Sequence, residues 1–535
     1  MGATIRNPIL SGFHPDPSIC RRGEDFYIAN SSFQWWPGVP IHHSRDLAHW
    51  ELVGYALTRT SQLDMDGTLD SAGIWAPCLS YCEADGLFHL IYTNVNRHSR
   101  YSPFETPNYL VTAPDPRGPW GEPVFLNRSG FDPSLFHDAD GRKWLVNMCM
   151  DGRPGAETLF AGILLQEYSP KDKRLVGPVT NIFRGTDLGA TEGPHLFRRG
   201  EWYYLIVAEG GTGYGHAMTM ARSRKITGPY EVHPENPMMT ARDTDLPLQK
   251  AGHGQLVETP GGEWYGVFLC GRPRGGRFCV LGRETAIERG SWGEDGWFRF
   301  DSPHPRVEVP APSPPPAPMA PPPRRDDFDS PTLALPFNTL RMPPGEEVSL
   351  TARPGWLRLR GTPRPIETNR RNTLVARRVQ HRDFDAATLM EYRPADASQA
   401  AGLVCFYGHA NYYWLRVSYH EDQGVVLELA QRCGGEPALA ARVPADWKQY
   451  HLRVAARDDK YQFGASPEPR RGASPDGAEW IDVGPPQDGN ILSDESASRF
   501  GAAFTGAFVG MAAVDLSGAG LGADFDFFEY EGTPT

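Results

Sequence analysis

Apolar and polar residues alternate over short runs along most of this chain, and helix-period patterns are nearly absent from residues 1 to about 305. Short alternating runs separated by Gly, Pro, Asn and Asp predict β-strands joined by turns. Alternation returns in the second part, in the runs 356–360, 412–417, 425–429 and 451–454. The pattern therefore predicts an all-β protein.

One unit recurs five times in the first part of the chain. Each copy has a short apolar strand, a turn that contains Gly (Gly23 in the first copy) and a strand rich in aromatic residues. The apolar anchors of the five copies are Ile19, Leu79, Leu135, Leu196 and Leu256, so the spacings are 60, 56, 61 and 60 residues. Repeated strand-rich units of this size predict a five-bladed β-propeller, with four strands in each blade around a central axis.

Chemically active residues come just before the anchors. In chain order they are Asp16, Trp75, Asp132, Glu192 and His253. Asp16 lies between two prolines, which hold it in a stiff segment, and by itself it could simply be part of an Asp-Pro turn. Because equivalent positions of a ring of blades meet at its axis, the recurrence favours a central site of three carboxylates, an indole and an imidazole.

A change of composition divides the chain. Residues 307–325 are rich in proline and predict an extended, semi-rigid connector. We expect residues 1–306 to form the propeller. We expect residues 326–535 to form one β-sandwich of the jelly-roll or concanavalin A-like kind, because their strands alternate and the repeat is absent.

Composition excludes several classes of function. The net charge of −12 argues against a nucleic-acid partner. The eight cysteines show no paired metal-ligand spacing, and no apolar run is long enough to span a membrane. The first residues lack the apolar segment of a signal peptide, so we expect a cytoplasmic location.

The motifs together resemble glycoside hydrolase family 43, and within it the two-domain β-xylosidases. The resemblance covers nearly the full length and rests on the motifs at 7–10, 13–18, 73–77, 131–134, 191–195, 252–255 and 281–285. It implies inverting hydrolysis that releases xylose from the non-reducing end of β-1,4-linked xylo-oligosaccharides. It also implies that Asp16 is the general base, that Glu192 is the general acid, and that Asp132 orients the acid and tunes its pKa.

The resemblance extends to a wider set of substrate-binding residues. Phe33 and Trp75 are expected to form apolar walls for a sugar, although Trp75 could instead be a core residue. Arg283 is expected to donate to sugar hydroxyls, with an ion pair to Glu284 as the alternative. Thr212 is expected at the rim of the site.

His253 is expected to hydrogen-bond the catalytic carboxylates. We expect no cofactor to be required, and the sequence provides no dedicated oxygen cage for a metal. A calcium-type divalent ion near His253 is left open.

The sandwich is expected to complete the mouth of the active site with a phenylalanine. Phe504 is the first choice and Phe508 the alternative; the one that is not the cap should be a core residue. We further expect a homo-oligomer, a dimer or tetramer, that binds neither nucleic acid nor membrane.

Two other functions compete with the β-xylosidase. One is an α-L-arabinofuranosidase, or an enzyme with both activities. The other is a non-catalytic sugar-binding propeller, against which the presence of all three carboxylates argues.

Overall fold

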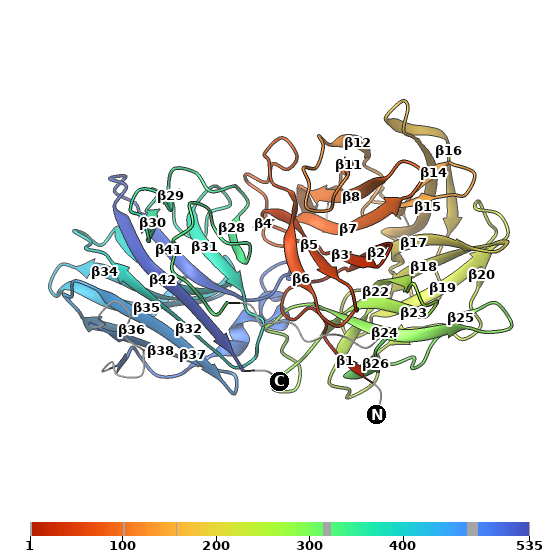
Figure 1. The fold of residues 1–535 in the computed structure, drawn as a ribbon. Coiled ribbons are helices and arrows are strands. Elements are labelled where there is room, and N and C mark those ends of the chain that lie inside the picture. Colours follow the sequence, from red (N-terminus) through yellow and green to blue (C-terminus); the bar gives the residue numbers. More distant parts are fainter. Residues whose placement is uncertain (1–2, 100–101, 157, 314–322, 468–479, 534–535) are drawn as a thin grey trace. The chain divides into compact units, whose positions relative to one another are not determined.

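The computed structural model describes residues 3–99, 102–156, 158–313, 323–467 and 480–533. The chain divides into two compact units, one comprising residues 1–272 and 283–319 and the other residues 273–282 and 320–535. Nearly all the regular structure is β-strand, so the all-β prediction is confirmed (Figure 1). Among the residues described, no helix has the length and apolar character needed to cross a membrane.

The first unit contains five antiparallel sheets, one for each copy of the sequence repeat (Figure 1). Their strands, in hydrogen-bonded order, are β2 (Ser18–Arg22), β3 (Asp25–Ala29), β5 (Gly38–Ser44) and β6 (Glu51–Leu57) in blade 1; β7 (Gly73–Cys82), β8 (Leu87–Val95), β11 (Asn108–Ala113) and β12 (Val124–Asn127) in blade 2; and β13 (Ser134–His137), β14 (Lys143–Met150), β15 (Phe160–Ser169) and β16 (Arg174–Phe183) in blade 3.

Blades 4 and 5 follow the same order. They contain β17 (Glu192–Arg199), β18 (Trp202–Glu209), β19 (Ala217–Ser223) and β20 (Glu231–Val232), with β21 (Met239–Thr240) also paired to β19; and β22 (Gln249–Glu258), β23 (Trp264–Gly271), β24 (Glu284–Trp292) and β25 (Phe298–Phe300). The short strands β4 (Trp35–Trp36), β9 (Arg97–Ser99) and β10 (Ser102–Glu105) lie between these in the chain.

The first strands of successive blades contact one another in a closed cycle, β2 to β7, β13, β17, β22 and back to β2. All five predicted anchors lie on these strands and are buried. The five-bladed propeller is therefore confirmed, and the residues just before the anchors surround its axis.

The ring is closed between blades 5 and 1 by the N-terminal segment. β1 (Thr4–Arg6) pairs with β26 (Glu308–Pro310), a strand within the segment predicted to be a connector. The buried Asn7 side chain donates from Nδ2 to the carbonyls of Ile287 (2.7 Å) and Arg306 (2.8 Å) and accepts from the Ile287 amide (2.9 Å). Prolines at a sheet edge tolerate such pairing. The central part of the predicted connector, 314–322, lies outside the described residues.

The second unit is a sandwich of two antiparallel sheets. One runs β29 (Val348–Ser349), β30 (Leu357–Arg360), β42 (Gly522–Gly532), β32 (Phe384–Glu391), β37 (Tyr450–Arg457), β38 (Lys460–Ser466) and β39 (Ile481–Asp482), with β27 (Arg325–Asp326) paired to β42 and β40 (Gln487–Asp488) to β38. The other includes, in order, β36 (Ala438–Pro444), β35 (Gly424–Cys433), β34 (Asn411–His420), β33 (Gln399–Gly408), β41 (Phe508–Asp515), β31 (Thr373–Arg378) and β28 (Phe337–Leu340).

Side chains of both sheets of this unit meet in one apolar core, which contains Leu452 and Phe525 from the first sheet and Leu403, Leu415 and Met511 from the second. A short 3-10 helix, η2 (Gly489–Leu492), and the single turn α1 (Asp494–Ala497) precede β41. Residues 273–282, which the sequence assigned to the propeller, belong to this unit: Leu281 is part of its core, and the Ala507 amide donates to the Val280 carbonyl at 3.0 Å.

We predict that Asn7→Ala lowers the thermal stability of the protein, because it removes three hydrogen bonds, two of them buried and one partly buried, at the closure of the ring. Leaving buried backbone groups unsatisfied costs about 1–3 kcal/mol each, so a fall in melting temperature of several degrees is expected in differential scanning calorimetry. Asn181→Ala, which removes one exposed hydrogen bond to the Ala161 carbonyl, is the matched control. Equal melting temperatures for the two variants would contradict this role of Asn7.

Candidate active site

A left-handed backbone conformation recurs at the axis of the propeller. The residue three positions before each anchor has positive φ: Asp16 (50°), Ala76 (29°), Asp132 (53°), Gly193 (56°) and His253 (44°). Such values cost a non-glycine residue on the order of 1–3 kcal/mol and cluster at functional sites. In β7, β17 and β22 the strand register shifts at the same place. Each blade therefore bends the chain where it reaches the axis.

The axial residues predicted from the sequence fall on two positions of this bend. Asp16, Asp132 and His253 are the residues with positive φ, whereas Trp75 and Glu192 each precede one. In blades 2 and 4 the bent position is taken by Ala76 and Gly193, which have little or no side chain. A shift of one residue turns a side chain in a strand to the other side, so the offset gives the indole and the acid a different direction from the residues of blades 1, 3 and 5.

Asp16 is buried and accepts hydrogen bonds from Ser31, which follows β3 in the same blade, and from Arg283 in blade 5. The Arg283 Nη1 donates to its Oδ1 at 2.8 Å, and the Ser31 hydroxyl donates to its Oδ2 at 2.5 Å. Ser31 Oγ in turn accepts from the Ala76 amide at 2.7 Å. Both carboxylate oxygens are thus oriented by donors, one of them the charged guanidinium of Arg283.

Arg283 occupies the centre of this group. Its Nη1 also donates to the Thr212 hydroxyl at 2.9 Å, and its guanidinium lies 5.4 Å from the centre of the Phe33 ring. The alternative partner Glu284 pairs instead with Arg272, whose Nε lies 2.7 Å from Glu284 Oε2. The predicted neighbours Arg283, Thr212 and Phe33 therefore meet around Asp16.

His253 stands between two of the predicted catalytic groups. Its Nδ1 lies 3.9 Å from Asp16 Oδ1 and 3.9 Å from Asp132 Oδ2. Burial lowers the pKa of His253 below its usual value despite the opposing charge of Asp16. The imidazole is thus neutral near pH 7 and contributes a polar contact without adding positive charge.

Asp132 is oriented by the residue that follows the predicted acid. The Gly193 amide donates to Asp132 Oδ2 at 3.0 Å, and a Cβ on Gly193 would lie 3.0 Å from the His253 ring. Glycine is needed here because a side chain would press on His253 and because φ is positive. This link ties the position of Asp132 in blade 3 to that of Glu192 in blade 4.

The two carboxyl groups in blades 3 and 4 resist ionisation. Burial, and after it the negative charge of Asp16, raise the pKa of Glu192 to about 8. Burial, then the charges of Glu192 and Asp16, raise the pKa of Asp132 well above its usual value. Because charge on one group opposes charge on the other, the pair retains a proton near neutral pH, as a general acid must.

Aromatic rings extend from the axis on the side of blades 1 to 3. Phe33 and Trp75 have ring centres 6.0 Å apart, and Trp75 meets Phe131 edge-on at 5.2 Å. Trp75 Nε1 donates to the Ser71 carbonyl at 2.9 Å, which fixes the indole plane. Both predicted apolar walls are therefore close to each other, as a wall for the apolar face of a sugar requires.

The two phenylalanines of the sandwich have different surroundings within their unit. Phe508 is buried in β41, but alternation places it on the opposite face of the sheet from the core residues Val509 and Met511, and its ring lies 5.5 Å from the Arg378 guanidinium. Phe504 precedes the strand and is partly exposed. That either residue caps the active site stays a prediction.

The sequence assigned no role to Ser31 or to Gly193, although Gly193 lies within the motif at 191–195. Their roles depend on hydrogen bonds between blades, which strand patterns do not reveal. A signal was present for Gly193: it stands at the repeat position that Asp16, Asp132 and His253 occupy elsewhere.

The family model described as "Glycosyl hydrolases family 43" matches residues 5–298. The chain belongs to this family. A second model, "Beta xylosidase C-terminal Concanavalin A-like domain", matches residues 325–531 of this family 43 protein, so the predicted resemblance and the sandwich are confirmed.

Among the relatives of this family 43 chain, "Xylosidase/arabinosidase 43B" of Humicola insolens is 48% identical over 98% of this chain and 97% of its own length. "Xylan 1,3-beta-xylosidase" of a Vibrio species is 43% identical over 99% of each. The crystal structure of xylan beta-1,4-xylosidase from Bacillus halodurans C-125 is 50% identical, covers 98% of this chain and all of its own, and superimposes with a TM-score of 0.94.

We predict that Ser31→Ala lowers kcat by about 10- to 100-fold and changes KM little, because a hydrogen bond to a charged group contributes about 1.5–3 kcal/mol. The adjacent Ser32 is the matched control: its hydroxyl accepts from the Val39 amide instead of contacting Asp16. Steady-state kinetics on an aryl xyloside, alongside melting temperatures, separate the two. Equal kcat values for Ser31→Ala and Ser32→Ala at equal stability would remove Ser31 from the site.

Proposed function

We propose that this family 43 protein is an exo-acting β-xylosidase that releases xylose from the non-reducing end of β-1,4-linked xylo-oligosaccharides with inversion at the anomeric carbon. The observation that carries the proposal is the convergence of Asp16, Asp132, Glu192, His253 and Arg283 on one buried axis. The names of the relatives support the substrate class.

In the proposed mechanism, Asp16 is the base. Its carboxylate, oriented by Arg283 and Ser31, accepts a proton from a water molecule as that water attacks the anomeric carbon. Glu192, kept protonated by its raised pKa, donates its proton to the departing glycosidic oxygen. An inverting reaction needs these two groups on opposite faces of the sugar, and blades 1 and 4 supply one each.

Asp132 acts on the acid without contacting the reacting atoms. Negative charge on Glu192 opposes ionisation of Asp132, so the two groups would not both be charged, and the hydrogen bond from the Gly193 amide fixes Asp132 beside the acid. Phe33 and Trp75 would cover the apolar face of the terminal sugar, while Arg283 and Thr212 would donate to or accept from its hydroxyls. A cap by Phe504 would restrict the site to chain ends.

Arabinofuranosidase activity is the second candidate, because one close relative is named both xylosidase and arabinosidase. The name of another relative specifies a 1,3 linkage. The linkage that the enzyme cleaves and the pentose that it releases thus need separate tests. The calcium-type ion near His253, the oligomeric state and the cytoplasmic location stay predictions.

Proton NMR of fresh product tests the proposal directly. The enzyme is incubated with β-1,4-xylobiose, β-1,3-xylobiose and an aryl α-L-arabinofuranoside in separate tubes. We expect the 1,4-linked disaccharide to react fastest and α-xylose to appear before mutarotation produces the β-anomer. Early β-xylose would exclude inversion, and a faster reaction of either other substrate would replace the proposed specificity.

We predict that Glu192→Gln loses activity unequally on different leaving groups. On xylobiose, whose alkoxide leaves poorly without a proton, kcat should fall at least about 1,000-fold, near the upper range for general acid catalysis. On an aryl xyloside with an acidic phenol the loss should be much smaller. Asp16→Asn is the control: because it removes the base, kcat should fall severely on both substrates. Equal losses for Glu192→Gln would show that Glu192 is not the acid.

We predict that Asp132→Asn shifts the alkaline limb of the pH profile of kcat/KM. The reaction needs protonated Glu192, so activity falls as the pH rises through its pKa, about 8 in the wild type. Glu192 and Asp132 titrate as an interacting pair, so a neutral amide at position 132 leaves Glu192 to ionise without a second carboxyl group beside it, and the limb moves to lower pH. A lower rate with an unmoved limb would mean that Asp132 acts through geometry alone.

A further inference from the structure

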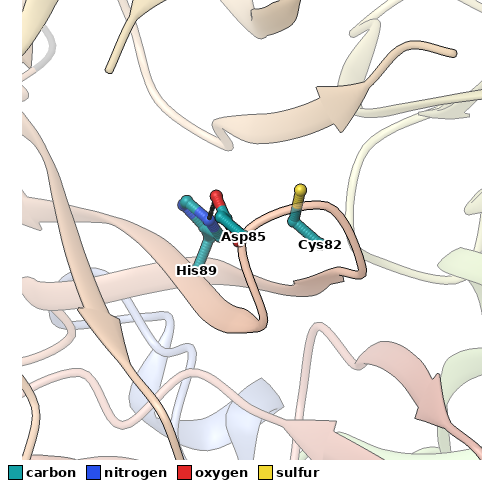
Figure 2. A group of neighbouring side chains, drawn as sticks. All are labelled: Cys82, Asp85 and His89. Carbon is teal, nitrogen blue, oxygen red and sulfur yellow. Dashed lines mark hydrogen bonds and ion pairs between the residues drawn. The ribbon is translucent and has the colours of Figure 1, made fainter. Parts of the chain in front are cut away.

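A second cluster of reactive side chains lies away from the axis, on the hairpin of blade 2 (Figure 2). Cys82 ends β7, at the opposite end of the strand from Trp75; Asp85 lies in the turn, and His89 lies in β8. One thiol, one carboxylate and one imidazole atom of these residues all lie within 4.8 Å of one another. Such a donor set has the chemistry of a metal site.

The ammonium group of a buried lysine already contacts this cluster. Lys143, at the start of β14 in blade 3, is buried, and its Nζ lies 3.0 Å from Cys82 Sγ, 3.0 Å from Asp85 Oδ2 and 3.0 Å from His137 Nδ1. An ammonium group has three N–H donors, and these contacts use all three. A metal ion bound to Cys82 and Asp85 would have to displace this ammonium group.

The histidines around Lys143 are neutral. Burial, then the charge of Lys143, lower the pKa of His137 to about 3 and that of His89 to about 4. Because His137 accepts from Lys143 at Nδ1, its proton is on Nε2, which donates to the Ser80 hydroxyl at 2.9 Å. For Asp85, burial alone would raise the pKa, but the hydrogen bond and charge of Lys143 and a hydrogen bond from the Leu87 amide lower it to about 2.

The contact between Cys82 and Lys143 places an amine nitrogen, which is a nucleophile when neutral, directly beside an oxidisable sulfur. A separation of 3.0 Å is typical of N–H···O bonds, and sulfur is larger than oxygen, so the two atoms are tightly apposed. Their side chains are almost completely buried, whereas the Asp85 side chain is 34% exposed. The edge beside Asp85 offers a small oxidant its approach to the sulfur.

We propose that Cys82 and Lys143 form a modification site, at which a peroxide converts the contact into a covalent sulfur–nitrogen cross-link between blades 2 and 3. In the first step hydrogen peroxide oxidises the thiol to a sulfenic acid and leaves as water. In the second step the Lys143 nitrogen attacks the sulfenic sulfur, the S–N bond forms, and the S–OH bond breaks to release a second water.

The protons of the second step leave to solvent and with the hydroxyl group. The ammonium group releases one proton to solvent at the edge beside the partly exposed Asp85, which frees the nitrogen lone pair, and the nitrogen loses its next proton as the S–N bond forms. One of these protons leaves with the hydroxyl group as water and the other passes to solvent. The net change in the protein is the loss of one hydrogen from sulfur and of one from the neutral amine.

Mass spectrometry of the full-length protein tests the cross-link. After reduction and then limited hydrogen peroxide, we expect a fraction of chains to lose two hydrogen masses and to give, on digestion, one joined peptide pair containing Cys82 and Lys143. Excess thiol should restore the separate peptides, because sulfenic derivatives are reversible. The exposed Cys433 is an internal control: it should oxidise without joining a lysine peptide.

Two variants and one metal probe complete the test. Cys82→Ser and Lys143→Arg should each abolish the joined peptide, and Lys143→Arg keeps the positive charge at the cluster. Recovery of Cys82 as a sulfinic acid beside unmodified Lys143, or as an unmodified thiol after Cys433 has oxidised, would overturn the proposal. So would uptake of one Zn²⁺ per reduced wild-type chain that Cys82→Ser abolishes, since the cluster would then be a metal site.

Discussion

Negative charge confined to a buried axis is the constraint on which the rest of the propeller depends. Asp16, Asp132 and Glu192 cannot all ionise in a small buried volume, so their surroundings determine which of them is charged. Arg283 and Ser31 donate hydrogen bonds to Asp16, whereas burial and the neighbouring charges keep a proton on the pair in blades 3 and 4. Three similar side chains thus meet different surroundings, because the hydrogen-bond donors around them are unequally distributed.

The propeller supplies these positions by repetition. Each blade brings its first strand to the axis through a residue with positive φ. In blades 2 and 4 the chemically active residue lies one position earlier in the chain, so its side chain takes a different direction while the blade itself is unchanged. The backbone strain at the four non-glycine positions is held by the paired strands that follow. The same scaffold can therefore present a carboxylate, an indole, an acid or an imidazole at equivalent points.

The sequence was sufficient to predict the five blades, the sandwich and the axial residues, because hydrophobic anchors at regular spacing and short motifs are local signals. It did not predict the role of Ser31, which depends on a hydrogen bond from the Ala76 amide in another blade. It also did not predict that Glu284 pairs with Arg272 instead of with its neighbour Arg283. The proline-rich composition also concealed β26, which pairs with β1 from the far end of the propeller sequence. Likewise, composition gave no indication that residues 273–282 leave the propeller unit, since Leu281 resembles any other strand residue. Each of these failures involves partners distant in sequence.

The closure of the ring has a practical consequence for anyone who handles this protein. Within the segment from Thr4 to His14, β1 pairs with β26 and Asn7 accepts a hydrogen bond from the buried Ile287 amide of β24. The His14 amide donates to the carbonyl of Arg283 at 2.9 Å, and the side chain of this arginine binds Asp16. Shortening this segment, or attaching a bulky fusion partner close to Thr4, would disturb the alignment of Asp16 with Arg283 before it disturbed any single blade. Affinity tags for purification and anchors for immobilisation on a support are therefore better placed at the other terminus, after Gly532, where β42 ends in the sandwich unit.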